Sequence, residues 1–371
     1  MQNTSAHNFS YWKKLYDDNK LEEFNFNDSG LLWLKIKSII RKELLSDFLR
    51  EHKINLENKS LGEQFIELYE LMNKDINKSH QQLDDFIRNK NKEQLKNLDV
   101  KKLVSELYKL KYFNWGGDYK NALDKYLVDR YIKVYQSYDE LVSKFDNEIR
   151  HAVQGYVLCS WYNNWSSILI EHIFKSHPIV LPTVGKIKKV DFFINNIPFD
   201  LKVTYLPANF IERKRKERGL KPELTELKQK ARQFQISFTK HNKADDTYYE
   251  IVEKMKDRND EFCKKALQNI KDVRLKILNE AKQNPIILVQ NLYEEQGEMR
   301  FDSANRLFLI LVDTEDFDNS WKLKRNLDLL TPAIKNYLNN FSDKKIEDLK
   351  INFQYENQNF TAYSDIIFVV K

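Results

Sequence analysis

Apolar residues recur every three to four positions through the first 176 residues, which is the period of amphipathic helices. Ser60 and Glu63 have the spacing of a capping box, so one of these helices is expected to begin there. The run Asn-Trp-Gly-Gly at 114–117 predicts a loop. A last helix is expected over residues 151–174, ended by Pro178. The N-terminal part is therefore predicted to be helical almost throughout.

The pattern changes after Pro178, where short runs rich in Val, Ile and Phe predict β-strands. Residues 220–280 then return to a charged, helical pattern. Two continuous apolar runs, at 284–293 and 305–313, predict strands that are buried on both faces. The three short runs that open this part of the chain lie at 178–182, 188–194 and 197–207.

A helix is expected over residues 321–341, and two closing strands are expected at 349–355 and 365–371. Together these elements predict an α/β (α+β) chain. A helix-rich region over residues 1–150 precedes a mixed β-sheet core, flanked by helices, over residues 151–371. We find neither an internal repeat nor a low-complexity linker in the sequence.

The stretch from Val190 to Val203 predicts a β-hairpin. Asn195 and Asn196 stand between two apolar runs, and asparagine tolerates the positive φ that a two-residue hairpin turn requires. The turn fixes a register in which six apolar side chains share one face, as a sheet lying on a core requires. They form three facing pairs, which are Val190 with Leu201, Phe192 with Phe199, and Ile194 with Ile197.

The opposite face of the predicted hairpin is charged. Asp191 faces Asp200, and Lys202 projects from the same face because side chains two positions apart on a strand do so. Facing carboxylates destabilise a sheet, so water, a proton, a lysine or a metal ion must offset their repulsion. Mg²⁺ is favoured because it prefers oxygen ligands and often binds through only one or two carboxylates. A neighbouring lysine can polarise a water or stabilise charge on a phosphate.

Asp191, eight intervening residues and then Asp200-Leu201-Lys202 resemble the motif of the PD-(D/E)xK nuclease superfamily, which includes most type II restriction endonucleases. The superfamily core is a helix, three strands, a helix and a strand. The resemblance covers about residues 165–312 and implies a restriction-endonuclease-like mixed β-sheet core. Val190 stands where the motif's name has proline, a position that varies in the family.

The resemblance also implies roles for individual residues. Asp191 and Asp200 correspond to the metal-binding acids of the catalytic site, and Lys202 corresponds to the catalytic lysine. Glu171, on the preceding helix, matches a further acid that family members often carry, and is implied to assist in metal binding. The implied cofactor is Mg²⁺.

The Asp/Glu-x-Lys tripeptide is common in this charged chain, so it carries little weight by itself. Asp348-Leu349-Lys350 is the strongest look-alike because it leads into an apolar strand, but no strand precedes its upstream acids. The hairpin at 190–203 combines facing acids, a lysine and a preceding helix. A solvated hairpin face with a Lys–Asp pair is the alternative interpretation.

Five cations that follow the hairpin suit an arm that contacts phosphates, namely Arg213, Lys214, Arg215, Lys216 and Arg218. A solvated helix end explains them equally well, because glutamates lie among them. Lys189 faces Lys202 in the predicted register and could help to hold a scissile phosphate. An exposed strand end is the alternative for Lys189.

The composition of the 371 residues adds limits. A net charge of +6 and a pI of about 8.8 are compatible with a polyanionic partner and do not prove one. The two cysteines are far apart, which disfavours a disulfide framework or a cysteine zinc site and fits a reducing cytoplasm. No apolar run is long enough for a membrane span, and the N-terminus lacks a signal-peptide core. The expected localisation is therefore cytoplasmic.

These observations and the resemblance predict a Mg²⁺-dependent DNA endonuclease, of the type II restriction kind, that acts in host defence against foreign DNA. The expected partners are double-stranded DNA and a second copy of the chain in a homodimer, with a cognate methyltransferase encoded nearby and no membrane. The helical N-terminal half is expected to serve target recognition, dimerisation or both. The alternatives are a nuclease subunit of a multi-component anti-phage or repair complex, and a non-catalytic DNA-binding protein with a decayed site.

Overall fold

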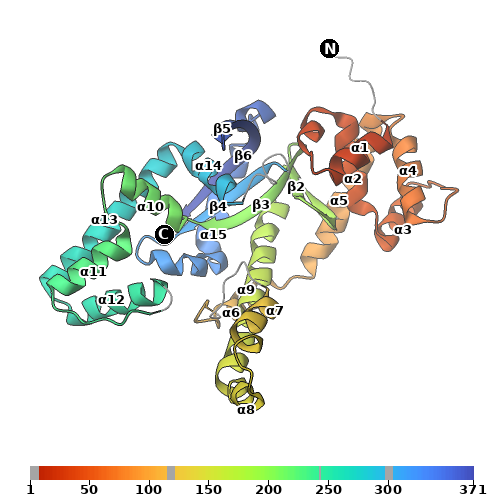
Figure 1. Ribbon diagram of the computed structural model, residues 1–371. Coiled ribbons are helices and arrows are strands. Elements are labelled where there is room, and N and C mark those ends of the chain that lie inside the picture. Colours follow the sequence, from red (N-terminus) through yellow and green to blue (C-terminus); the bar gives the residue numbers. More distant parts are fainter. Residues whose placement is uncertain (1–7, 115–121, 242–243, 297–303) are drawn as a thin grey trace. The chain divides into compact units, whose positions relative to one another are not determined.

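A computed structural model describes residues 8–114, 122–241, 244–296 and 304–371 (Figure 1). The chain forms two compact units, each assembled from separate segments. The first unit comprises residues 1–30, 198–320 and 344–371, and the second comprises 31–197 and 321–343. None of the four unit boundaries falls near residue 150, which begins a helix inside the second unit. The division of roles between 1–150 and 151–371 stays a prediction.

The second unit is mainly helical, as the apolar period predicts. Ser60 caps its helix as expected, because the side chain accepts a hydrogen bond from the backbone N–H of Glu63. Residues 115–117 of the predicted loop lie outside the described residues. The helices are α2 (Asp28–Ile39), which begins just before the unit, α3 (Lys42–Glu51), α4 (Leu61–Met72), α5 (Ile76–Lys96), α6 (Val100–Leu107), α7 (Leu123–Leu127), α8 (Tyr138–Val142), α9 (Arg150–Lys175) and α15 (Leu327–Asn339).

Two antiparallel strands of the second unit, β1 (Val180–Ile187) and β2 (Val190–Ile194), follow α9 where the sequence predicts strands. The ring of Phe174 on α9 stacks on the ring of Phe192 on β2, with centroids 4.9 Å apart. Helices α5 and α9 both pack against β1. The apolar side chains of β2 are buried, and the strand pairs with β1, against which both helices pack.

The first unit contains a sheet with strand order β3-β4-β6-β5. The strands β3 (Ile197–Tyr205), β4 (Arg306–Val312) and β6 (Gln358–Val370) are parallel, and β5 (Lys350–Tyr355) pairs antiparallel with β6. Every residue of β4 is buried, as its continuous apolar run predicts. The chain is thus mixed α/β, which agrees with the fold class expected from the sequence.

One face of this sheet is covered by α10 (Ala208–Glu217), α13 (Glu261–Gln283) and α14 (Pro285–Gln296), which share a core with the strands. Helices α11 (Glu223–Gln233) and α12 (Ala244–Arg258) stack beside α13 around a smaller core of their own (Figure 1). Before the sheet, α1 (Phe9–Asp17) and the 3-10 helix η1 (Glu22–Phe26) complete the unit.

The strand predicted at 284–293 is wrong, because these residues form the helix α14. Pro285 stands at the first helical position, where its missing N–H costs nothing. The buried side chains Leu288, Val289, Leu292 and Tyr293 recur with a helical period, and Ile286 is exposed. A short apolar run does not by itself distinguish a buried strand from a helix with one buried face.

The helix predicted over 321–341 is divided in the structure. A 3-10 helix, η5 (Phe317–Arg325), ends before the α-helix α15 begins. Asn326 separates them and caps α15, since its side chain accepts a hydrogen bond from the backbone N–H of Leu329. In the described part of the chain no helix is both long enough and apolar enough to cross a membrane.

Candidate active site

The turn between β2 and β3 has the backbone that the hairpin prediction requires. Asn195 has φ of 48° and Asn196 has φ of 66°, the left-handed conformations of a two-residue hairpin turn. The side chain of Lys35 on α2, fully buried, donates a hydrogen bond of 3.0 Å to Oδ1 of Asn196. The same ammonium lies 2.7 Å from a carboxylate oxygen of Asp84 on α5. The turn is therefore held by an ion pair of the second unit whose lysine is fully buried.

Asp191 lies on β2 between two buried neighbours, Val190 and Phe192. Its carbonyl oxygen accepts a hydrogen bond of 3.0 Å from the hydroxyl of Thr183 on β1. Because side chains alternate along a strand, Asp191 projects from the face opposite to Phe192. Phe193 is also fully buried, so β2 is covered on both sides and Asp191 is half-buried.

A cavity of about 810 Å³ opens beside these elements in the second unit. Its wall is formed by α5, the residues that follow α5, α9, β1 and β2, and it includes both Glu171 and Asp191. The Glu171 carboxylate lies 2.7 Å from Nζ of Lys175, one turn along α9. Burial holds the pKa of His172, also in the wall, below its ordinary value, so its imidazole is neutral at pH 7.

Asp200 and Lys202 form an ion pair on β3 in the first unit. Nζ of Lys202 lies 2.7 Å from Oδ1 of Asp200, and Asp200 is 9 % exposed. The backbone N–H of Asp200 donates a hydrogen bond of 2.9 Å to the carbonyl oxygen of Asn305. The Asn305 side chain in turn donates to the carbonyl oxygen of Pro198 across 2.8 Å. Asn305 therefore anchors the start of β3 at Pro198 and at Asp200.

Arg306 is a neighbour of this ion pair that the sequence did not reveal. It stands opposite Asp200 in the parallel β3–β4 ladder, and side chains of laddered residues share a face. The residue is 2 % exposed, and its guanidinium lies 4.9 Å from the ring centroid of Tyr293 on α14. The pairing of β3 with β4, between which helices α10 to α14 lie in the sequence, brings Arg306 beside Asp200.

The predicted site residues fall in different units. Glu171 and Asp191 belong to the second unit, whereas Asp200 and Lys202 belong to the first. The facing of Asp191 with Asp200 stays a prediction from the hairpin register. The look-alike at Asp348 is set apart by its structure, since Asp348 lies in a 3-10 helix, η6 (Ile346–Leu349), before the strand begins. Its carboxylate accepts a hydrogen bond of 2.9 Å from the backbone N–H of Lys345.

Most of the five cations expected to contact phosphates are engaged with carboxylates of the first unit. Arg215 is fully buried and is paired with Glu226, and it also donates to the carbonyl oxygen of Lys221. Lys216 is exposed and makes no ion pair with the residues described in the structure. The remaining pairs are Arg213 with Glu294 at 3.2 Å, Lys214 with Glu217 at 2.8 Å, and Arg218 with Glu280 at 2.5 Å.

Lys189 occupies the turn between β1 and β2, where it has a positive φ of 68°. It is half-buried, in contrast to the exposed Lys188 beside it. The contact of Lys189 with a phosphate was predicted because Lys189 faces Lys202 in the hairpin register. That contact stays a prediction.

Over residues 8–114, 122–241, 244–296 and 304–371, no group of three or more His, Cys, Asp and Glu side chains is arranged to hold a metal ion. Magnesium often uses one or two carboxylates and keeps several of its waters, which is fewer protein ligands than such a group supplies. Asp200 fits that mode of binding, because it offers carboxylate oxygens beside a compensating ammonium.

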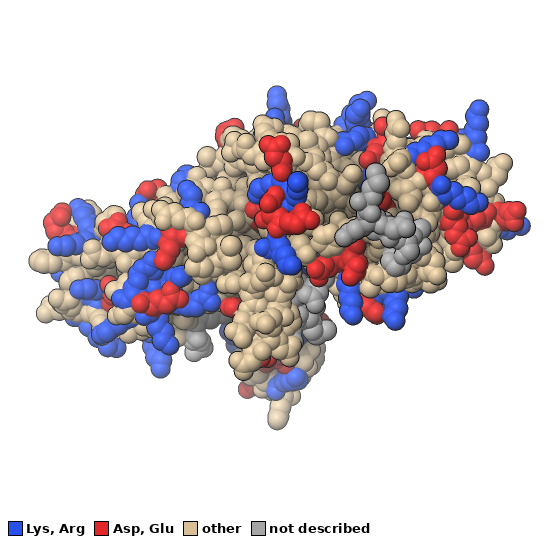
Figure 2. Space-filling model, turned by 90° about the horizontal axis from the view of Figure 1, so that it is seen from above, with Lys and Arg blue, Asp and Glu red and all other residues tan. Residues whose placement is uncertain are grey.

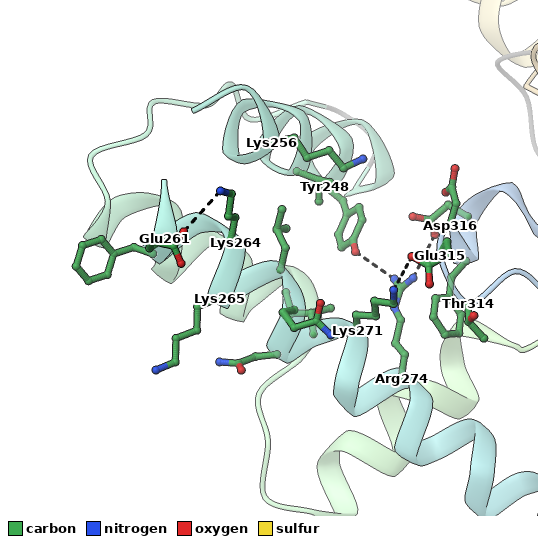
Figure 3. Close-up of a pocket in the computed structure, with 18 residues that line it drawn as sticks. Tyr248, Lys256, Glu261, Lys264, Lys265, Lys271, Arg274, Thr314, Glu315 and Asp316 are labelled. Carbon is green, nitrogen blue, oxygen red and sulfur yellow. Dashed lines mark hydrogen bonds and ion pairs between the residues drawn. The ribbon is translucent and has the colours of Figure 1, made fainter. Parts of the chain in front are cut away.

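A second cavity of about 810 Å³ lies in the first unit, between α12, α13 and residues 314–318 (Figure 3). Its charges are largely paired within the wall. Lys271 lies 2.7 Å from a carboxylate oxygen of Glu315, and Arg274 donates to the hydroxyl of Tyr248 across 3.2 Å. Figure 3 shows Lys265 pointing away from these pairs. The cavity therefore presents no concentrated field of one sign to a ligand.

The surface seen in Figure 2 carries Lys and Arg side chains interspersed with Asp and Glu side chains. On this face neither sign covers an extended area, so the net charge of +6 is not gathered there. A nucleic-acid contact on this face would depend on individual cations more than on a broad basic surface.

Comparison of the chain with protein-family models, with curated proteins and with solved structures found no match.

Proposed function

We propose that the protein is a Mg²⁺-dependent DNA endonuclease of the type II restriction kind. The observation that carries the proposal is the Asp200–Lys202 pair, a mostly buried carboxylate held by a lysine on β3. The pair follows a turn whose two asparagines have positive φ. The order α9, β1, β2 and β3, followed by helices and then β4, supports the proposal, because the resemblance implies a helix, three strands, a helix and a strand. Helices α10 to α14 stand where the resemblance implies a single helix.

The acidic residues supply the metal ligands in this proposal. Asp200, and Asp191 through the hairpin register, would hold Mg²⁺ with their carboxylate oxygens, and Glu171 would assist. Bound Mg²⁺ supplies a Lewis acid that polarises a phosphoryl oxygen and makes a bound water more acidic. Lys202 keeps the buried Asp200 carboxylate compensated, which offsets the cost of removing that charge from water.

Lys202 acts on the reacting phosphate. Its side chain is 38 % exposed, so the ammonium can donate to a water or phosphate oxygen while it contacts Asp200. The water oxygen attacks phosphorus in line and the bond from phosphorus to the leaving sugar oxygen breaks. A proton of the water passes to solvent, and the leaving oxygen takes up a proton from solvent to become a hydroxyl. A fixed cation beside the phosphate stabilises the negative charge that develops in the transition state.

A second candidate is a nuclease subunit that depends on a partner protein for DNA binding. The ion pairs of Arg213, Lys214, Arg215 and Arg218 favour it, because cations paired with carboxylates contribute little to phosphate binding. Purified protein that cleaves DNA only after the partner is added would support this candidate.

The proposal is tested by incubating supercoiled plasmid and phage DNA with the protein in Mg²⁺, in EDTA, and with an Asp200→Asn variant. We expect discrete fragments from the wild-type protein in Mg²⁺ alone. Digestion by Asp200→Asn at the wild-type rate would show that the site has been placed wrongly. Smearing of the DNA without discrete bands would contradict cleavage at specific sequences, but it would still support a nuclease activity.

A further inference from the structure

The cavity beside α9 is rich in carboxamide side chains, for which the proposed reaction has no use. Five of them belong to its wall, namely Asn91, Gln94, Asn97, Asn163 and Asn164. A carboxamide has an oxygen that only accepts hydrogen bonds and a nitrogen that only donates them. What such a wall can recognise therefore depends on which end of each amide is already engaged by the protein.

Asn163 has its oxygen engaged. Lys324, on η5, donates a hydrogen bond of 2.9 Å from Nζ to Oδ1 of Asn163. A lysine ammonium can only donate, so Asn163 must present its oxygen to it, and the Nδ2 amide remains for the cavity. Lys324 is 7 % exposed, so the contact is a buried one and the orientation of the amide is fixed.

Asn91 and Gln94 are oriented the opposite way. Nδ2 of Asn91 donates to the carbonyl oxygen of Lys175 across 3.0 Å, and Nε2 of Gln94 donates to the carbonyl oxygen of Val184 across 3.3 Å. Carbonyl oxygens can only accept, so each side chain has its oxygen left for a ligand. Asn91 is 6 % exposed. The wall thus combines one fixed donor with two fixed acceptors.

The rest of the wall limits the charge of the ligand. Its charged residues are the two acids Glu171 and Asp191 and the single base Lys175, which leave a net negative charge. The His172 ring also belongs to the wall, and its buried Nδ1 has no hydrogen-bond partner among the described residues. A polar, uncharged group with both donors and acceptors suits this wall better than an anion does.

We propose that this cavity binds a nucleobase of the nucleic-acid substrate, with Nδ2 of Asn163 as the donor and the side-chain oxygens of Asn91 and Gln94 as acceptors. Base edges present donors and acceptors side by side, and their patterns differ from base to base. At about 810 Å³ the cavity lies within the range of small-ligand sites and is larger than a single base, so it also leaves room for the attached sugar. The choice of a nucleic acid as ligand rests on the proposed function.

The deciding variant is Asn163→Asp. It keeps an oxygen for Lys324 and adds a charge that pairs with the ammonium, so the fold is retained, but it removes the donor from the cavity. The assay measures fluorescence anisotropy of labelled 15-nucleotide strands of dA, dC and dT in EDTA, where cleavage does not occur. We expect the wild-type protein to prefer one strand by about tenfold. Asn163→Asp should bring the three affinities close together without lowering the melting temperature.

Two further variants complete the test. Lys324→Met releases the Asn163 amide and should weaken the preference, whereas Asn279→Ala, at an exposed amide on α13, should leave it unchanged. Equal affinities in the wild-type protein, or an undiminished preference in Asn163→Asp, would overturn the inference. Plasmid cleavage without base preference would overturn the inference of a base-binding cavity and leave the proposed nuclease activity supported. Base preference without cleavage would overturn the proposed nuclease activity and support base binding in the cavity.

Discussion

Lys202 holds Asp200 along a single strand, with its ammonium nitrogen 2.7 Å from the carboxylate oxygen. Residues two positions apart on a strand share a face, so the contact needs no other element to form it. The Asp200 side chain is 12 % exposed and the Lys202 side chain 38 % exposed, so the acid is fixed while the ammonium still reaches solvent. This asymmetry suits an anchored acid and a cation that meets a substrate.

Replacing Lys202 should separate binding from cleavage. Lys202→Met keeps an apolar stem and removes the ammonium, so we expect plasmid cleavage in Mg²⁺ to fall about 100-fold or more, since a donor aimed at transition-state charge is lost. The matched control is Lys350→Met, which removes the exposed lysine of the look-alike tripeptide and should cleave normally. Equal loss in the two variants would indicate that neither lysine acts in the reaction.

Because α14 is a helix with one buried face, substitutions at its buried and exposed positions should have different effects on stability. Leu288 is fully buried and Ile286 is 49 % exposed, although both belong to one apolar run. Leu288→Ala should lower the free energy of unfolding by about 3 kcal/mol, whereas Ile286→Ala should change it by less than about 0.5 kcal/mol. Urea unfolding measures both. Large and similar losses at the two positions would contradict a helix with one buried face.

Lys324 predicts a pH dependence of stability. Burial lowers its pKa from 10.5 to about 8 in the folded protein. Below pH 8 both states carry the proton, and the folded state bears the full cost of the buried charge, roughly 3 kcal/mol. Between about pH 8 and 10.5 the unfolded chain retains a proton that the folded protein has lost. The contribution of Lys324 therefore makes the free energy of unfolding rise with pH across this window.

Lys324→Met tests this directly, because the variant has no group to titrate there. The difference in free energy of unfolding between variant and wild type should shrink as the pH rises from 8 to 10. Denaturant titrations of both proteins at several pH values measure this difference in free energy of unfolding. A difference that stays constant over this range would mean that Lys324 has an ordinary pKa in the folded state.

The pair of the fully buried Lys35 with the partly exposed Asp84 should contribute to the stability of the second unit. Lys35→Ala leaves the Asp84 carboxylate and Oδ1 of Asn196 without their shared donor, so we expect a loss of about 3 kcal/mol. The comparison is Lys13→Ala, whose pair with Asp17 is exposed and should matter by less than about 1 kcal/mol. Chemical unfolding that gave similar values for both would remove the case for a buried anchor at the turn.

Local patterns predicted much of the fold because they depend on neighbouring residues. The turn at Asn195 and Asn196 followed from two residues that tolerate positive φ, and β4 followed from its unbroken apolar run. A similar run failed at α14, where periodicity over ten residues suits a helix as well as a strand. The cue that was available is Pro285, which favours the first position of a helix over the inside of a sheet.

In the candidate site, too, some residues could be predicted from the sequence and others could not. Asp200 and Lys202 could be predicted because they share one strand, and the structure pairs them. Arg306 could not, because its place beside Asp200 depends on a parallel ladder between strands distant in sequence. The orientation of Asn163 was hidden for a similar reason, since it is set by Lys324 from a remote segment. Residue type follows from sequence, but the partner that fixes a side chain follows from tertiary structure.

The strand order β3-β4-β6-β5 has a consequence for synthesis on the ribosome. Strand β6 lies between β4 and β5 and pairs with both, yet residues 358–370 are translated after every other element of the sheet. A nascent chain that ends after β4 therefore carries an apolar strand with an open edge, a form that invites association with other chains. Translation that stalls between residues 312 and 358 would thus leave a product that needs chaperone protection, and vectorial folding of the first unit can finish only after β6 emerges.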